Sequence, residues 1–382
     1  MTQPSTVALV RCESYEPEAV QAAVQRGLSL LGGVEQFVQP GETILFKPNI
    51  LEGADPMKCI GPHPVVFEAV LEAFRAVDAH YTYGDSPGFG SPKGMARMSG
   101  LGKIADAKGV ELADFVNGEE VAFPQGKMIK KFTIAKGVLA ADGIISLPKM
   151  KTHALARLTG AVKNTFGCVP GFLKAEFHSL MPSADMFAKM LVDLNLLLQP
   201  RLYIMDGIYA MEGNGPRNGT PRPMNALIFS ADPIALDTVV ARMMNLDPKL
   251  VETCMHGDAW GLGTMKNYEL VGDPLDTFIA ADYNVNRSPL STSTGIGFLT
   301  TSLMKNIFTP RPVINEELCI RCGRCIQVCP AVPEKALSWP DGDMTKAPVY
   351  DYNLCIRCYC CQEMCPAEAI TVKTPLLGRL LH

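Results

Sequence analysis

The chain has 382 residues, of which 47% are hydrophobic and 7% aromatic, and its formal net charge at pH 7 is -4. This length and apolar content predict two or three domains with a sizeable core, and the slight acidic excess argues against nucleic acid as a partner. The N-terminal stretch lacks the charged and apolar parts of a secretory signal, and no apolar run reaches transmembrane length. We therefore expect a cytoplasmic protein without a transmembrane segment.

Apolar runs alternate with helical patterns as far as residue 275. The pattern predicts strands at residues 7–11, 43–46, 81–83, 201–205 and 226–230, and one within 138–147. It predicts helices at residues 17–31, 63–77, 92–108, 184–198 and 233–244. Strands that alternate with helices of this length are typical of βαβ units. The fold expected for residues 1–275 is therefore an α/β domain with a largely parallel, Rossmann-like sheet.

Polar side chains follow several of the expected strands. Lys47 and Asn49 come after the second strand, Asp85 after the third, and Asp206 after a later one. Because the carboxyl ends of parallel strands face the ligand crevice of such folds, we expect these side chains to share one edge. The loop at residues 84–88 could also cradle an anion with its backbone amides, although a plain strand–helix turn is an equally good interpretation.

The densest polar chemistry lies just after the strand within 138–147. Lys149, Lys151 and His153 alternate, so in an extended chain they share one face. Lys163 and Asn164 open or cap a further segment of small residues. Together these groups predict a cationic pocket for a carboxylate, phosphate or enolate, in which a lysine or His153 could donate a proton. The alternative is a solvated loop with surface lysines.

Other polar positions allow two interpretations. His63 precedes the proline that opens a helix, so it either lines the crevice or neighbours a helix cap. Asp232 is expected to be a helix N-cap, and Asp237 one turn later is a candidate buried carboxyl. Residues 213–219, rich in Gly, Pro and Asn, predict a mobile lid or a long surface turn.

Two copies of one cysteine pattern dominate the last part of the chain. The first run is Cys319, Cys322, Cys325 and Cys329, and the second, 36 residues later, is Cys355, Cys358, Cys361 and Cys365. Each run has the C-x2-C-x2-C-x3-C-P spacing of bacterial ferredoxins, in which three thiolates hold one [4Fe–4S] cluster and the fourth cysteine reaches the other cluster. We therefore assign one cluster to Cys319, Cys322, Cys325 and Cys365, and the second to Cys355, Cys358, Cys361 and Cys329. Structural zinc has no use for a third two-residue step, and disulfides between such close neighbours would be strained.

Five cysteines lie outside these two sets, and two of them are notable. Cys360 sits inside the second run as a bystander, although a ligand set with Cys360 in place of Cys361 is conceivable. Cys168 follows Gly167 and is either a core residue or has a local metal or thiol function.

The remaining segments are organised around the cysteine runs. Residues 276–310 form a connector, in which 297–308 are expected to be a short amphipathic helix that docks the following module. Residues 311–373 form a small α+β ferredoxin-like domain, whose insert at 331–353 predicts an extra loop or hairpin. The apolar tail at 374–382 is expected to dock onto the protein.

The polar motifs of the α/β part resemble the family called "domain of unknown function 362" (DUF362), whose members often carry a ferredoxin module behind that domain. The resemblance covers residues 5–275 or so, and it is carried by Lys47-Pro48-Asn49, His63-Pro64, Gly84-Asp85-Ser86-Pro87, Pro148-Lys149-Met150-Lys151-Thr152-His153, Val162-Lys163-Asn164 and Asp206-Gly207. It implies a site with cofactor-binding and catalytic residues, although the family's reaction is unassigned. The cofactor-binding residues would be Lys47, Asn49 and His63, and the catalytic ones Asp85, Lys149, Lys151, His153, Lys163, Asn164 and Asp206.

Taken together, these features predict an iron–sulfur oxidoreductase of anaerobic or low-oxygen metabolism. Electrons exchanged with a ferredoxin- or flavodoxin-like partner protein would cross two clusters to a small anionic substrate in the crevice. The lysines and Asn164 would bind it, and His153 or a lysine would manage protons, oriented by Asp85 or Asp206. The sequence has no flavin, haem or nicotinamide motif, so an additional cofactor is unidentified. The alternative is a non-catalytic electron carrier or a partner in metallocentre assembly.

Overall fold

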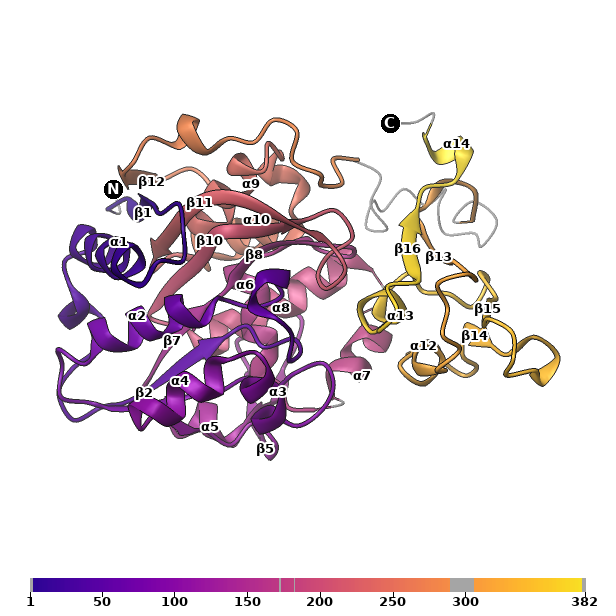
Figure 1. The fold of residues 1–382 in the computed structure, drawn as a ribbon, viewed down its shortest axis with the longest axis horizontal. Coiled ribbons are helices and arrows are strands. Elements are labelled where there is room, and N and C mark those ends of the chain that lie inside the picture. The colour runs from indigo at the N-terminus through magenta and orange to yellow at the C-terminus, as the bar shows by residue number, and fades with distance from the viewer. Residues whose placement is uncertain (1–2, 172, 182, 289–305, 380–382) are drawn as a thin grey trace.

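A computed structural model describes residues 3–171, 173–181, 183–288 and 306–379. Most of the amphipathic helix expected at 297–308 therefore lies outside the described residues. The α/β domain and the cysteine-rich module lie side by side, with the module at the right-hand side of Figure 1.

The α/β domain is built on one mixed sheet, which has ten strands within the described residues. Its order is β12 (Tyr268–Gly272), β1 (Ser5–Arg11), β11 (Thr220–Ser230), β10 (Leu202–Glu212), β7 (Gly143–Leu147), β2 (Thr43–Pro48), β3 (His80–Tyr83) and β4 (Glu111–Leu112), with β8 (Lys149–His153) beside β10 and β9 (Arg157–Thr159) beside β8. Strands β10, β7, β2, β3 and β4 run parallel, as do β8 with β10 and β1 with β12. The largely parallel α/β sheet is therefore confirmed, but the antiparallel run β10–β11–β1 was not predicted.

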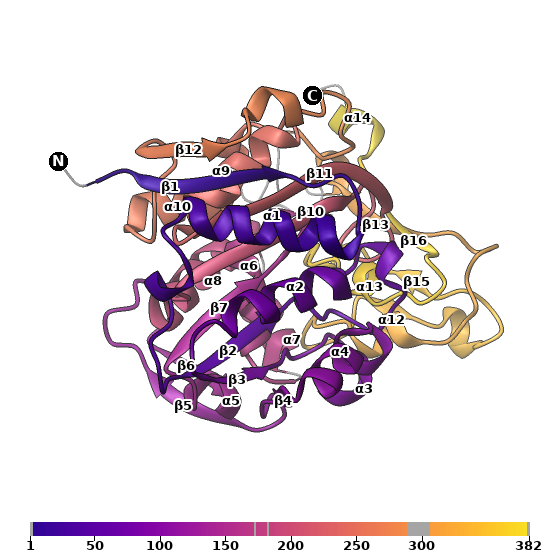
Figure 2. The same cartoon turned by 60° about the vertical axis from the view of Figure 1, so that its left-hand side comes forward.

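Helices cover both faces of this sheet. They are α1 (Pro17–Leu30), α2 (Pro64–Phe74), α3 (Pro92–Met98), α4 (Leu101–Lys108), α5 (Lys136–Leu139), α6 (Ala161–Asn164), α7 (Leu173–Leu180), α8 (Ala184–Leu198), α9 (Pro233–Met243) and α10 (Glu252–Trp260), with short 3-10 turns at Val34–Gln36, Pro56–Lys58, Thr165–Cys168, Pro248–Leu250 and Leu275–Phe278. A further 3-10 turn, at Pro340–Gly342, lies in the cysteine-rich module. Figure 2 shows α1 and α2 in front of the sheet. Neighbouring strand residues point to opposite faces: Phe46 packs with α1 and α2, whereas Leu45 packs with α8. Burial on both faces explains why the strands read as continuous apolar runs.

Three local features depart from the expected pattern. The helix predicted at 92–108 is two helices, because Gly100 between them adopts φ 84°. Asp206 does not end a strand: β10 continues through a bulge between Gly207 and Tyr209. An antiparallel hairpin of β5 (Gly118–Ala122) and β6 (Lys131–Ala135) was not predicted either.

The cysteine-rich module contains two small antiparallel pairs of strands. These are β13 (Arg311–Ile314) with β16 (Ile370–Lys373), and β14 (Leu337–Ser338) with β15 (Val349–Tyr350). The second pair confirms a hairpin in the 331–353 insert. The described helices are α12 (Arg324–Gln327), α13 (Cys360–Glu363) and α14 (Leu376–Arg379).

The apolar tail does not dock as expected. Leu376 and Leu377 in α14 are 76% and 51% exposed, respectively. That expectation is therefore wrong for the described part of the tail. Among the described helices, none is both long and apolar enough to cross a membrane.

Asp193 in α8 fastens the loop between β5 and β6 to the domain, and this contact can be tested. Its buried carboxylate accepts the backbone N–H groups of Lys127, Met128 and Ile129 at 2.6–2.9 Å. Asp193→Ala leaves these donors without an acceptor and should lower the free energy of unfolding by roughly 2–3 kcal/mol. Thermal unfolding followed by circular dichroism would measure the loss. Asp247→Ala is the matched control, because exposed Asp247 accepts a single backbone N–H; equal losses in the two variants would contradict the assignment.

Candidate functional site

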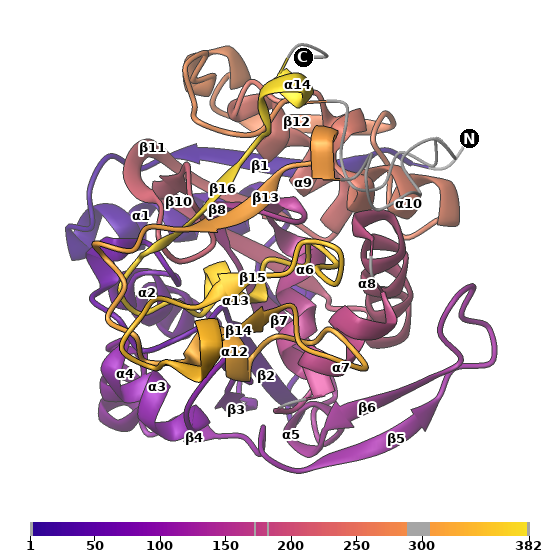
Figure 3. The same cartoon turned by 90° about the vertical axis from the view of Figure 1, so that its right-hand side faces the viewer.

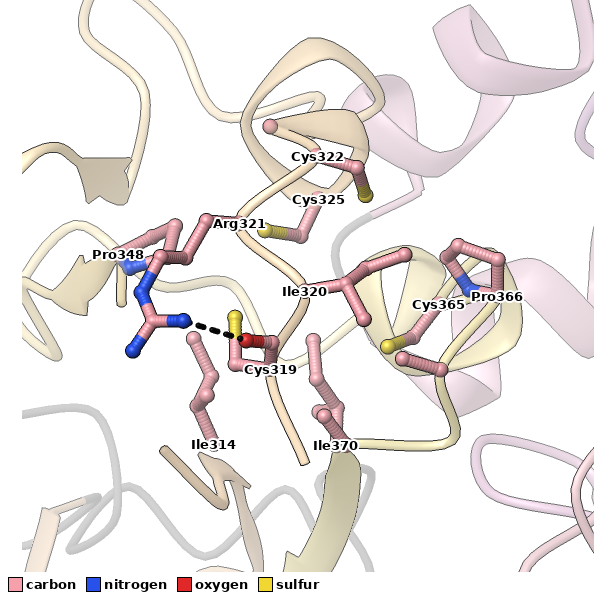
Figure 4. Close-up of a pocket in the computed structure, with 13 residues that line it drawn as sticks. Ile314, Cys319, Ile320, Arg321, Cys322, Cys325, Pro348, Cys365, Pro366 and Ile370 are labelled. Carbon is pink, nitrogen blue, oxygen red and sulfur yellow. Dashed lines mark hydrogen bonds between the residues drawn. The ribbon is translucent and has the colours of Figure 1, made fainter. Parts of the chain in front are cut away.

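Four cysteines surround a cavity in the module. It is lined by Cys319, Cys322, Cys325 and Cys365, together with apolar side chains such as Ile314, Ile320 and Ile370. Figure 4 shows these cysteines around the space, with Cys365 arriving from the second run. Four thiols within apolar walls are the donor set of a [4Fe–4S] cluster. The chemistry of the residues therefore fits that cofactor.

A second cavity is lined by the complementary set of cysteines. Its ligand candidates are Cys329, Cys355, Cys358 and Cys361. Cys361 lines this cavity, and the Tyr350 hydroxyl donates a hydrogen bond to its Sγ at 3.2 Å. Cys360 is not among the lining residues, and it lies within electrostatic range of Lys163 in the α/β domain. The geometry therefore favours Cys361 over Cys360 as the ligand.

The first polar cluster of the sheet edge is centred on Lys47. Its Nζ lies 2.8 Å from Asp85 Oδ1 and donates to Asn164 Oδ1 at 2.9 Å. Asn164 also accepts from Asn49, whose own oxygen accepts from Lys151 Nζ at 2.8 Å. These five predicted residues therefore meet in one network. Apart from the half-buried Asn49, they are buried.

Gly167 and α6 allow this network to form. A Cβ on Gly167 would lie 1.8 Å from Asp85 Oδ1, so only glycine fits beside the Lys47–Asp85 pair. Asp237, from α9, accepts the N–H groups of Ala161 and Val162 and so anchors the start of α6. Burial raises the pKa of Asp237 to about 7. The role of Asp237 is therefore structural. The sequence-based expectation of a buried carboxyl at this position is confirmed.

The second polar cluster forms because β8 pairs with β10 in the register that sets Lys149 opposite Asp206. Lys149 Nζ lies 2.7 Å from Asp206 Oδ2 and 2.9 Å from the Tyr15 hydroxyl. The His63 backbone N–H also donates to Asp206, and the His63 ring stacks on Tyr15 at 3.8 Å. His63 is at the same time the N-cap of α2, since its Nδ1 accepts from Val65 N. The helix-cap interpretation of His63 is therefore confirmed, its place in a ligand crevice stays a prediction, and Tyr15 was missed.

The third polar cluster lies where α13 meets the sheet edge. Figure 3 shows the module in front of this part of the α/β domain. His153 Nε2 lies 2.9 Å from Glu363 Oε1, while His153 Nδ1 accepts the N–H groups of Leu155 and Ala156. Because Nδ1 acts as an acceptor, the proton of the neutral imidazole sits on Nε2. Burial lowers the pKa of His153 to about 4, so the ring is neutral at pH 7.

Lys163 and His178 complete this third cluster. Burial raises the pKa of the Glu363 carboxyl, but His153, Lys163 and His178 outweigh burial and lower it to about 2. Burial lowers the pKa of Lys163 and takes that of His178 to about 4. His153 is the strongest of the three neighbours that lower the pKa of the Glu363 carboxyl, followed by Lys163 and His178.

Several atoms of the third cluster have no hydrogen-bond partner within the described residues. They are His153 Nε2, Glu363 Oε1 and His178 Nδ1, all of them buried. His153 Nε2 and Glu363 Oε1 thus approach to 2.9 Å without hydrogen-bond geometry. Lys47, Lys149 and Lys151 each make short hydrogen bonds, whereas Lys163 Nζ makes none to the described part of the chain. Buried polar atoms without partners are rare in folded proteins and are typical of functional sites or of positions that bind water or an ion.

The loop at 213–219 holds the module in place. Gln362 donates to the backbone and side-chain oxygens of Asn214 at 2.9 Å, and Arg217 donates to the carbonyl of Cys365. Arg217 also pairs with Glu52 at 2.5 Å. This loop therefore connects the α/β domain to the cysteine-rich module. The sequence predicted a mobile lid or a long surface turn here, and neither prediction included this contact.

Three further expectations have clear outcomes. Asp232 is the N-cap of α9, as predicted, accepting from Ile234 N and Ala235 N. Cys168 is buried in the core, and burial raises its pKa to about 12, so it stays a protonated thiol. The anion cradle at 84–88 is wrong, because Ser86 N already donates to Gly167 O and the next helix begins only at Pro92.

Sequence reasoning missed Glu363, Gln362 and His178. A comparison of the two cysteine runs could have revealed the first of these. Glu363 follows Cys361 by two residues, and the corresponding residue of the first run is Gln327. A charge that appears in only one copy of a repeat indicates a contact that only this copy makes.

The ligand assignment leads to a test with neighbouring cysteines. Cys361→Ala should lower the iron and acid-labile sulfide per chain, because the second set loses one thiolate. Cys360→Ala is the matched control and should keep both at the level of the unaltered protein. Chemical iron and sulfide analysis of protein purified without oxygen would measure this. A loss in Cys360→Ala as large as in Cys361→Ala would contradict the assignment.

Comparisons with known proteins agree with the sequence motifs. Residues 44–242 match the family described as "Domain of unknown function (DUF362)", and residues 312–332 and 348–371 match the "4Fe-4S binding domain". The chain is 37% identical over 258 residues to "Thylakoid-associated protein sll1697" of Synechocystis sp., covering 67% of this chain and 80% of that protein. A crystal structure of a Thermotoga maritima protein is similar over 59% of this chain and 57% of the Thermotoga chain, with 12% sequence identity and a TM-score of 0.38. The resemblance seen in the sequence is confirmed, and the chain belongs to the DUF362 family and carries a 4Fe–4S binding domain behind its α/β domain.

Proposed function

We propose that this protein is an iron–sulfur oxidoreductase that passes low-potential electrons through two [4Fe–4S] clusters to a small anionic substrate at the edge of the α/β sheet. The observation that carries the proposal is the position of α13 (Cys360–Glu363). Cys361 of this helix lines the second cysteine cavity, while Glu363 of the same turn contacts His153. One helical turn therefore separates a cluster ligand from the third polar cluster.

The residues of the third polar cluster suit the reduction of an anion. When bound, the iron–sulfur clusters would supply single electrons. Lys163, which has no hydrogen bond to the described part of the chain, would bind a carboxylate or a developing enolate. His153, with its proton on Nε2, would donate a hydrogen bond to the developing anion, and Lys163 would deliver its proton to the reduced substrate and become the neutral amine. The other two polar clusters, in which Lys47 pairs with Asp85 and Lys149 with Asp206, would hold β8 and α6 in position.

The redox partner would dock beside the first cysteine cavity. Cys322 is exposed there, and its neighbours Leu318 and Ile320 are 53% and 63% exposed. An apolar surface around an exposed cluster ligand is suited to docking of a ferredoxin- or flavodoxin-like protein. The proposed compartment is the cytoplasm. Cell fractionation would test it against a thylakoid location, which the name of the Synechocystis relative gives for that protein.

A second candidate function is that of an electron carrier or assembly partner without turnover of its own. The observation in its favour is that the Glu363 carboxylate already lies against His153, where a substrate anion would bind. In a carrier this contact would simply fix the module to the α/β domain.

Native mass spectrometry of protein purified without oxygen separates the two candidates. A mass equal to the chain with two [4Fe–4S] clusters and a further released small molecule supports the oxidoreductase. A mass with the two clusters alone favours the carrier. A mass that accounts for fewer than two clusters would contradict both.

Replacement of Lys163 tests the site directly. With reduced methyl viologen as electron donor and a panel of short 2-oxo and 2,3-unsaturated carboxylic acids as probes, Lys163→Ala should lower turnover by roughly 100-fold or more, the usual loss for an anion-stabilising group. Iron content and reduction potentials should stay unchanged. Lys103→Ala is the control, because Lys103 is exposed on α4. Equal turnover in the two variants would remove Lys163 from the mechanism.

A further inference from the structure

Corresponding arginines of the two cysteine runs lie in contrasting environments. Arg321 precedes Cys322 and Arg357 precedes Cys358, and both have a left-handed backbone, with φ of 57° and 62°. Arg321 is exposed at the rim of the first cavity, as Figure 4 shows, and its Nη1 contacts the Cys319 carbonyl at 3.4 Å. Arg357 is 0% exposed and is one of the largest fully buried side chains. The repeat thus places the same residue once in water and once in the interior.

The guanidinium of Arg357 is poorly compensated by the protein. Its Nη2 donates to Asn306 Oδ1 at 2.6 Å, and its Cζ lies 5.0 Å from the centre of the Tyr352 ring. Its Nε and Nη1 are buried without a hydrogen-bond partner, and no carboxylate of the described residues forms an ion pair with it. A buried cation in this state is strongly unfavourable unless a negative charge lies nearby.

The second cysteine set supplies the missing negative charge. A [4Fe–4S] cluster with four thiolate ligands is anionic, and reduction makes it more so. Arg357 does not line the cavity, but its neighbours Ile356 and Cys358 do. Tyr352, which packs on the guanidinium, is within electrostatic range of both Arg357 and Cys355. The charge of Arg357 therefore acts on the second set through the low-dielectric interior.

We propose that Arg357 is the internal counter-charge of the second cluster and raises its reduction potential. Burial alone disfavours the extra electron, since the reduced cluster carries more negative charge. A fixed positive charge in the interior offsets this effect, because Coulomb interactions are much stronger there than in water. Arg321, surrounded by water, has a smaller effect on the first cluster even though it lies closer to its cavity. The arginine pair thus favours electron transfer from the exposed first cluster to the second.

This inference rests on the cluster-binding half of the proposed function and is independent of any substrate. The full chain, purified without oxygen, would be titrated electrochemically while the reduced clusters are followed by electron paramagnetic resonance. In Arg357→Met one of the two potentials should shift to a more negative value while the other stays in place. Arg321→Met is the matched control and should shift neither potential by a comparable amount. Iron analysis of each variant shows whether both clusters are present.

Two results would overturn the inference. One is an unchanged pair of potentials in Arg357→Met at full iron content, and the other is an equal shift in both methionine variants. If Arg357→Met fails to retain iron, Arg357→Gln and Arg357→Lys are compared instead. The potential of the second cluster should be more negative in the glutamine variant than in the lysine variant, because only lysine keeps the positive charge. Equal potentials in these two variants, or loss of iron in both, would show that Arg357 has only a structural role. A low iron content in the unaltered protein would instead contradict the proposed function itself.

Discussion

The structure depends on the compensation of buried positive charge at one edge of the sheet. Lys47 is balanced by Asp85, and Lys149 by Asp206, all within the α/β domain. The third cluster is different, because its carboxylate, Glu363, comes from the cysteine-rich module. Breaking either of the first two pairs leaves an uncompensated buried charge and costs several kcal/mol, roughly 3–5. The position of the module is fixed by the approach of Glu363 to the neutral His153 together with the hydrogen bonds of the loop at 213–219.

This arrangement joins the two chemical halves of the protein. A helix of four residues has one side on a cysteine cavity and the other on the polar edge of the sheet. Within the third cluster, histidines that burial keeps neutral stand beside a lysine and a carboxylate. Groups of this kind can hold an anion and move a proton without large rearrangement of water. The module also covers this edge of the sheet, where His153 and Glu363 are both buried.

Much of this architecture follows from the sequence, and the failures have physical causes. The strand ends that carry Lys47, Asp85 and Lys149 could be predicted, because apolar runs buried on both faces end where polar residues begin. Asp206 was misplaced because the glycine that follows it looks like a strand end, whereas it forms a bulge in a longer strand. The two cysteine runs single out Glu363 as a charge present in only one copy, but they do not give its partner His153, which comes from the other domain.

The cysteine sets illustrate both the power and the limit of spacing. Their spacing alone predicts which cysteines face one another, and the structure gathers each expected set around its own cavity. Spacing says nothing about the difference between Arg321 and Arg357, because burial of the second is decided by the connector residue Asn306 and by Tyr352.

The exchange of the fourth cysteine between the two runs has a consequence for biosynthesis. The first set needs Cys365, and the second needs Cys361 together with Cys329. Neither set is complete when the ribosome has synthesised the chain only as far as the first cysteine run. With these ligand sets, cofactor insertion would wait until Cys365 has been synthesised, by which time the α/β domain that precedes it is available as the template against which α13 settles. Ribosome-bound chains that stop before Cys361 would lack a complete thiol set of either kind.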